Sequence, residues 1–133
     1  RMQDEVPKVL DLKGESQATH KLYGFGQNGV DQKFARQCLL ARRLAEAGVR
    51  FIELTAPVNW DHHFFLSQRL AEACVATDQP VAGLLEDLKQ RDMLNDTLVI
   101  WAGEFGRTPY AQSADGRDHN NKGYSLWMAG GGV

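Results

Sequence analysis

The hydrophobic positions of the chain follow a helical spacing in two long stretches, with a strand-like stretch between them. In residues 33–48, apolar side chains recur every three or four positions up to Gly48, which predicts a helix that ends there. The segment "VRFIELT", residues 49–55, is rich in β-branched and aromatic residues and predicts a largely buried strand. The helical spacing returns from Ser67 to Arg91, where we expect Pro80 to kink or divide the helix.

Two further strands are predicted in the last third of the chain. "LVIWAG", residues 98–103, is a continuous apolar run after a turn, and "YSLWMAG", residues 124–130, is a second one. Residues 1–23 carry only weak helical patterns and predict an irregular, partly helical lead-in. The alternation of helices and strands predicts an α/β fold with a mainly parallel sheet flanked by helices.

The composition fits one globular unit and excludes several functions. The chain has 133 residues and a net charge of −2, with 15 basic and 17 acidic side chains spread along its length. No basic patch indicates nucleic-acid binding, and no apolar run approaches the roughly 20 residues that span a bilayer. Cys38 and Cys74 fall in predicted helices, where a thiol usually packs as a small apolar group, so we expect two free cysteines.

A glycine-rich loop precedes the first long helix. Gly24, Gly26 and Gly29 match the G-x-G-x-x-G pattern of dinucleotide-binding loops. The buried strand that should come before such a loop is missing, because "SQATHKLY" is too polar. We therefore expect no nucleotide to bind here.

Acidic and imidazole side chains gather in the loops that follow the predicted strands. They are Asp61, His63, Glu104, Asp118 and His119. Asp61 and His63 stand two residues apart, so in extended backbone both project to one side and can hold a single ion. Carboxylate with imidazole suits zinc or manganese best, and further carboxylates would also accept calcium or magnesium. The alternative is that these residues form solvated turns, with Asp118 capping a loop.

Two arginines lie in the same loop as the later acidic residues. Arg107 and Arg117 carry guanidinium groups, whose planar fork of donors suits a tetrahedral oxyanion such as phosphate or sulfate. They are the candidate catalytic residues, placed to stabilise charge on a transferred group. The alternative is a structural salt bridge, between Arg107 and Glu104 or between Arg117 and Asp115.

Several segments resemble a known bacterial family. "FARQCLLARRLAEAGVRFIEL", "NWDHHFF", "DTLVIWAGEFGRTPY" and "GRDHNNKGYSLWMAGGGV" are similar to the domain of unknown function 1501, of the alkaline phosphatase and sulfatase superfamily. The resemblance covers nearly the entire chain. It implies an α/β core in which metal ions at the strand ends polarise a phosphate or sulfate ester.

The resemblance assigns roles to individual residues. It implies that Asp61 and His63 of "WDHH" and His119 of "GRDH" are metal ligands. Glu104 stands where the superfamily has an aspartate, and Phe105 stands where it has a histidine, so one ligand of a two-metal site is lost. The superfamily's nucleophile and first metal-binding aspartate lie upstream of these residues.

The sequence therefore predicts part of a metal-dependent hydrolase that acts on a small anionic ester of phosphate or sulfate. We expect residues 1–133 to form a single partial domain, the carboxyl-proximal part of an alkaline phosphatase-like domain, and to be inactive alone. The other hypothesis is a non-catalytic relative that binds a ligand or a protein. No nucleic acid or membrane partner is expected, whereas exposed sheet edges predict homo-oligomers. The resemblance implies export, to the periplasm in bacteria.

Overall fold

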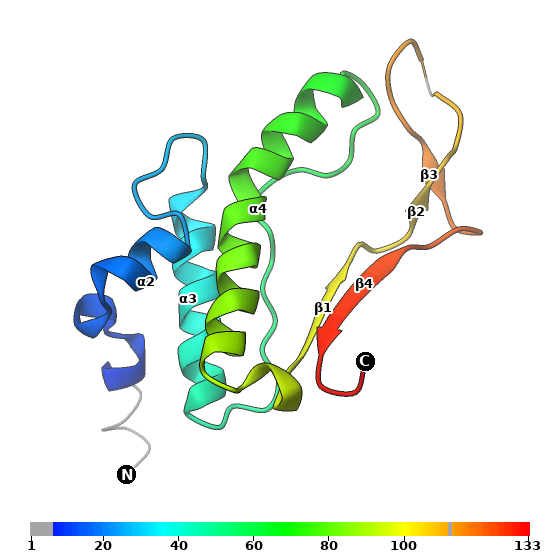
Figure 1. The fold of residues 1–133 in the computed structure, drawn as a ribbon. Coiled ribbons are helices and arrows are strands. Elements are labelled where there is room, and N and C mark those ends of the chain that lie inside the picture. The colour runs from blue at the N-terminus through cyan, green and yellow to red at the C-terminus, as the bar shows by residue number, and fades with distance from the viewer. Residues whose placement is uncertain (1–6, 112) are drawn as a thin grey trace.

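A computed structural model describes residues 7–111 and 113–133 of the chain. Helices lie on one side of the structure and a long pair of antiparallel strands on the other (Figure 1). After a helical turn at residues 7–10, the elements are η1 (Leu12–Gly14), α2 (Gln17–Leu22), α3 (Gln32–Glu46), α4 (Leu66–Gln90), η2 (Leu94–Asp96), β1 (Leu98–Ala102), β2 (Gly106–Arg107), β3 (His119–Asn120) and β4 (Leu126–Gly130). The partly helical lead-in is confirmed from residue 7 onward, and residues 1–6 of that prediction lie outside the described residues.

Helix α3 forms where the sequence predicts it. The Asp31 carboxylate accepts a hydrogen bond from the Phe34 backbone N–H at 2.8 Å, which caps the first turn. At the other end, Gly48 adopts a φ of 87°, a conformation that glycine enters without steric cost. The periodic apolar side chains are buried, which confirms the predicted helix.

Helix α4 continues through Pro80 as one ribbon that bends along its length (Figure 1). Proline has no N–H to donate to the carbonyl four residues earlier, which belongs to Ala76. That carbonyl instead accepts a hydrogen bond from the backbone N–H of Asp31 at 3.0 Å. The helix is thus not divided, because the start of α3 satisfies the oxygen that the proline frees.

The core lies between the helices. Its buried side chains are Leu12, Tyr23, Phe34, Cys38, Leu39, Leu84 and Leu88, and the inward side chains of β1 pack against them. Arg42 of α3 is 1% exposed and donates to Asp87 Oδ2 at 2.9 Å from Nε, while its Nη2 lies 2.7 Å from Glu15 Oε1. Tyr23 donates its hydroxyl to Asp87 at 3.0 Å, so one buried polar network joins α2, α3 and α4.

The strands form two two-stranded antiparallel sheets. Strand β1 pairs with β4, with Ile100 opposite Met128, and β2 pairs with β3, with Arg107 opposite His119. Both strands predicted in the last third of the chain are confirmed. The parallel sheet stays a prediction, because the paired strands of the described residues are few and run antiparallel.

Residues 49–55 do not form the strand that the sequence predicts. The segment has no strand partner among the described residues, and Phe51 is 83% exposed. Its side chains still alternate between half-buried and exposed positions, with Ile52 and Leu54 turned inward. The prediction is wrong for a physical reason: β-branched and aromatic composition indicates a segment that packs against a core, whereas a strand also needs a neighbour for its backbone hydrogen bonds.

Both cysteines are free, as predicted. Cys38 is buried in α3, where burial raises the pKa of its thiol to about 12, and Cys74 is partly buried in α4. Within the described ranges, no helix is both long enough and apolar enough to cross a membrane.

Candidate metal centre

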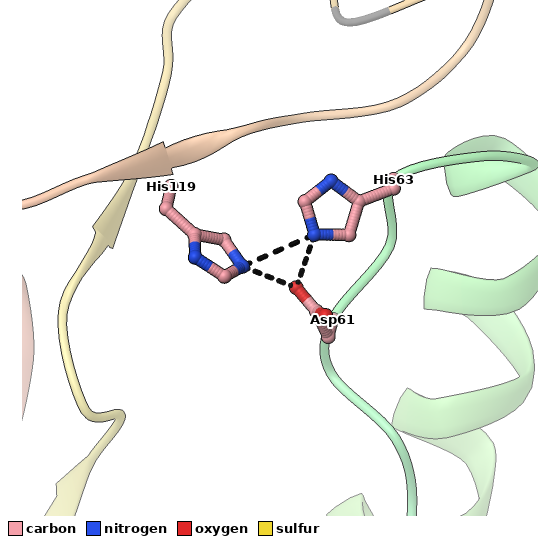
Figure 2. Close-up of side chains that lie close together, drawn as sticks. All are labelled: Asp61, His63 and His119. Atoms are coloured by element: carbon pink, nitrogen blue, oxygen red, sulfur yellow. Dashed lines mark hydrogen bonds and ion pairs between the residues drawn. The ribbon is translucent and has the colours of Figure 1, made fainter.

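The loop before α4 positions the first two candidate ligands. The backbone N–H of Asp61 donates to Asn59 Oδ1 at 2.8 Å, and the backbone N–H of His63 donates to the Asp61 carbonyl at 3.2 Å. The backbone is therefore turned rather than extended. The Asp61 and His63 side chains nevertheless point toward the same place (Figure 2).

The β2–β3 hairpin positions the third candidate ligand, His119. The backbone N–H of Thr108 donates to the Asp118 carbonyl at 3.0 Å, and the Thr108 hydroxyl accepts from the Asp118 N–H at 3.0 Å. Gly106 permits the close approach of β2 to the segment that follows β3, because a Cβ at position 106 would lie 1.9 Å from the Gly123 carbonyl oxygen. Sequence reasoning missed Thr108, a buried residue whose role depends on a partner ten positions away.

Asp61, His63 and His119 converge on one point (Figure 2). The Nε2 atoms of His63 and His119 each lie 2.9 Å from Asp61 Oδ1 and 3.1 Å from each other. The ring of Phe105 packs on the His119 ring, with the two centroids 4.5 Å apart. Three ligand atoms, two from the loop before α4 and one from β3, thus form a compact triangle.

A fourth group, the guanidinium of Arg107, meets the same carboxylate oxygen. Arg107 Nη1 donates to Asp61 Oδ1, and Arg107 Nη2 donates to Glu104 Oε1 at 2.9 Å. Hydrogen bonds from His119 and Arg107 lower the pKa of the Asp61 carboxyl to about 2. The carboxylate therefore stays ionised at neutral pH, which suits a metal ligand.

The remaining predicted site residues lie around the triangle and outside it. Glu104 is linked to it through Arg107, which forms the salt bridge that the alternative hypothesis predicts. The Asp118 carboxylate accepts from the His119 backbone N–H at 2.7 Å, so it caps the local backbone. Arg117 donates to the Gly116 carbonyl at 2.9 Å. Asp115 binds Ser67 at the start of α4, with 2.7 Å between the hydroxyl and Oδ2.

An open groove of about 1590 Å³ runs beside the triangle, between the helices, residues 48–62 and β1. Asp61, Arg107 and Arg117 are among the residues that line it, together with Trp60 and His62. His62 is 5% exposed, and its Nε2 and the Nε1 of Trp60 have no hydrogen-bond partner among the described residues. Burial, with the nearby charges of Arg69 and Arg107, lowers the pKa of His62. The burial of His62 could not be predicted from the sequence, because polar loops such as this one usually lie at the surface.

The triangle fits a divalent cation. Ligand atoms about 2.1 Å from a tetrahedral zinc ion lie about 3.4 Å apart, so these three atoms need to separate by only a few tenths of an ångström. Two imidazole nitrogens that face one carboxylate oxygen and each other are mutually satisfied when they share a cation. Asp61, His63 and His119 can therefore hold a metal, whereas Glu104 and Asp118 are bound elsewhere.

The helical core, the paired strands and this triangle define a helix-and-strand chain with a candidate metal centre at a loop-rich edge. The chain matches, over residues 1–133, the family described as "Protein of unknown function (DUF1501)". The match spans the whole chain, and the chain therefore belongs to that family. The match also confirms the family resemblance that the sequence motifs indicate. No curated protein and no solved structure shows a significant match.

Proposed function

We propose that the chain is the carboxyl-proximal part of a metal-dependent hydrolase that acts on phosphate or sulfate esters. The observation that carries the proposal is the convergence of Asp61, His63 and His119 on one point, with the Arg107 guanidinium at its edge. A carboxylate and two imidazoles suit zinc or manganese, and the arginine adds a binding group for an anion. The alkaline phosphatase and sulfatase superfamily supplies the reaction class for this combination.

In this proposal, one set of side chains binds the cation and another binds the anionic ester. Asp61, His63 and His119 would hold the cation, which acts as a Lewis acid on the ester and lowers the pKa of the attacking group. Arg107 and Arg117 line the groove beside it and would bind the equatorial oxygens of the transferred group. In this proposal the nucleophile comes from a segment that precedes residues 1–133. The ester itself is a small anion that enters through the open groove.

The test measures metal content and turnover of the full-length polypeptide that carries this chain. An aryl phosphate and an aryl sulfate serve as substrates. We expect Asp61→Ala and His119→Ala each to lose the bound metal and the turnover. The control is His20→Ala, because His20 packs on Phe25 and lies in α2, on the opposite side of α4 from the β2–β3 hairpin that carries His119 (Figure 1). Unchanged metal content and rate in both site variants would contradict the proposal.

A non-catalytic binding module is the second candidate, and one observation favours it. Arg107 joins Asp61 and Glu104 in a two-armed ion pair, which can serve as a structural link in a protein-binding surface. The two candidates differ in their response to a chelator. A metal-built site loses melting temperature in excess EDTA, whereas a binding module keeps it.

A further inference from the structure

Three nitrogen atoms surround Asp61 Oδ1, an oxygen that has two lone pairs for hydrogen bonds. Arg107 Nη1 donates to it, and the Nε2 atoms of His63 and His119 lie 2.9 Å from it. The other arm of Arg107 is held separately by Glu104, at 2.9 Å. Arg107 also lies over the Phe105 ring, with 5.4 Å between its Cζ and the ring centroid. The guanidinium is thus anchored in two ways that do not involve Asp61.

A cation in the triangle changes this balance. The cation would approach Oδ1 to about 2.1 Å, which places it within a few ångströms of the guanidinium that binds the same oxygen. Two positive groups so close repel each other strongly, even at the half-exposed position of Asp61. The hydrogen bond to Glu104 and the contact with the Phe105 ring would hold the guanidinium once Nη1 leaves Asp61 Oδ1.

We propose that Arg107 and the divalent cation compete for the same oxygen of Asp61, so that cation binding releases one arm of the guanidinium. This inference rests on the proposed metal centre and deepens it. Arg107 and Arg117 both line the groove, so a released arm of Arg107 can reach an anion bound there. Arg107 thus binds the Asp61 carboxylate before the cation arrives and binds the anionic ester afterwards.

The first test is a calorimetric titration of Mn²⁺ into the protein and its Arg107→Gln variant. Glutamine keeps a hydrogen-bond donor but removes the charge, so we expect Mn²⁺ to bind about tenfold more tightly. The control is Arg117→Gln, which removes an equal charge from a side chain that donates to the Gly116 carbonyl. We expect that change to be below about threefold, because a screened, more distant charge contributes little. Equal affinities in the protein and Arg107→Gln, or equal tightening in both variants, would overturn the inference.

A second measurement covers the case in which Arg107→Gln loosens the loop. In the unmodified protein, the Arg107 Nη hydrogens are observed by NMR before and after addition of Zn²⁺. We expect their exchange with solvent to become faster, since one arm loses its partner. Zinc binding that leaves this exchange unchanged would overturn the inference and leave the metal centre standing. Failure of both Mn²⁺ and Zn²⁺ to bind the protein would overturn the inference and the proposed function together.

Discussion

His119 Nε2 lies 2.9 Å from Asp61 Oδ1, although 58 positions separate the two residues. Antiparallel pairing brings them together. Strand β4 returns beside β1, and the same reversal pairs β3 with β2, so His119 arrives opposite Arg107. The candidate metal centre therefore depends on the β2–β3 hairpin as much as on the "WDHH" loop.

The hairpin can be tested without touching a ligand. In Gly106→Ala, the new Cβ would lie 1.9 Å from the carbonyl oxygen of Gly123, in the segment that follows β3, and 3.2 Å from the carbonyl oxygen of Asn120, so that segment must shift and we expect His119 to shift with it. We expect Mn²⁺ affinity to fall by about tenfold or more, while the helical signal in circular dichroism is retained. Gly103→Ala is the matched control, because the nearest atom to its Cβ is Phe105 O at 3.7 Å. Equal Mn²⁺ affinity in the two variants would contradict this role of the hairpin.

The buried arginine of the core gives a second prediction. Arg42→Met removes one charged partner from each of the buried carboxylates of Glu15 and Asp87, which keep Arg43 and Arg91 respectively. We expect the free energy of unfolding to fall by about 2 to 3 kcal/mol, measured by urea denaturation, because each carboxylate loses one hydrogen bond to a charged group but keeps another. Arg36→Met, at an exposed position of the same helix, should change it by less than about 0.5 kcal/mol. An Arg42→Met protein as stable as the unmodified one would show that the network is dispensable.

Glu15 links stability to pH. Burial alone would raise its pKa, but hydrogen bonds from Arg42 and Arg43 outweigh burial and lower the pKa below its ordinary value of 4.5. A lowered pKa in the folded state stabilises the protein above the unfolded-state pKa, and this contribution is lost as pH falls through the folded-state pKa. We therefore expect unfolding free energy to decline below about pH 4.5, and Glu15→Gln to decline less steeply. Parallel pH profiles for both proteins, from urea denaturation, would contradict this.

Local patterns predicted the elements whose formation is local. The apolar period of α3 and the cap at Asp31 lie within the helix itself, and β1 is a continuous apolar run. Whether residues 49–55 form a strand depends on a partner strand elsewhere in the chain. Helix α4 continues through Pro80 because the backbone N–H of Asp31 donates to the Ala76 carbonyl. A local sequence window contains neither kind of long-range contact.

The site shows the same division. Motif spacing predicted a cation site that includes Asp61, His63 and His119, the three residues that the structure brings together. It could not separate His119 from its neighbour Asp118, because adjacent strand residues point to opposite faces and the sequence does not say which face is inside. The Arg107 link between Asp61 and Glu104 depends on side-chain geometry that no spacing encodes.

Exposed strand surfaces lead to a prediction about assembly. Leu98, Ile100 and Met128 are 47%, 55% and 46% exposed, and the register of β1 with β4 places them on one face. An apolar sheet face of this kind favours association, so we expect the isolated chain to form dimers or larger species in light scattering. Ile100→Lys should shift the population toward monomer. A monodisperse monomer of the unmodified chain would contradict the prediction.

The metal centre itself is tested most directly by Mn²⁺ titration calorimetry on a set of single-residue variants. We predict that Asp61→Asn and His119→Ala abolish binding, because the first removes the negative charge of the oxygen ligand and the second removes a ligand nitrogen. We also predict that Asp118→Asn binds Mn²⁺ nearly as well as the unmodified protein, since the Asp118 carboxylate accepts a hydrogen bond from the His119 backbone N–H. Retained binding in Asp61→Asn and His119→Ala would contradict the account.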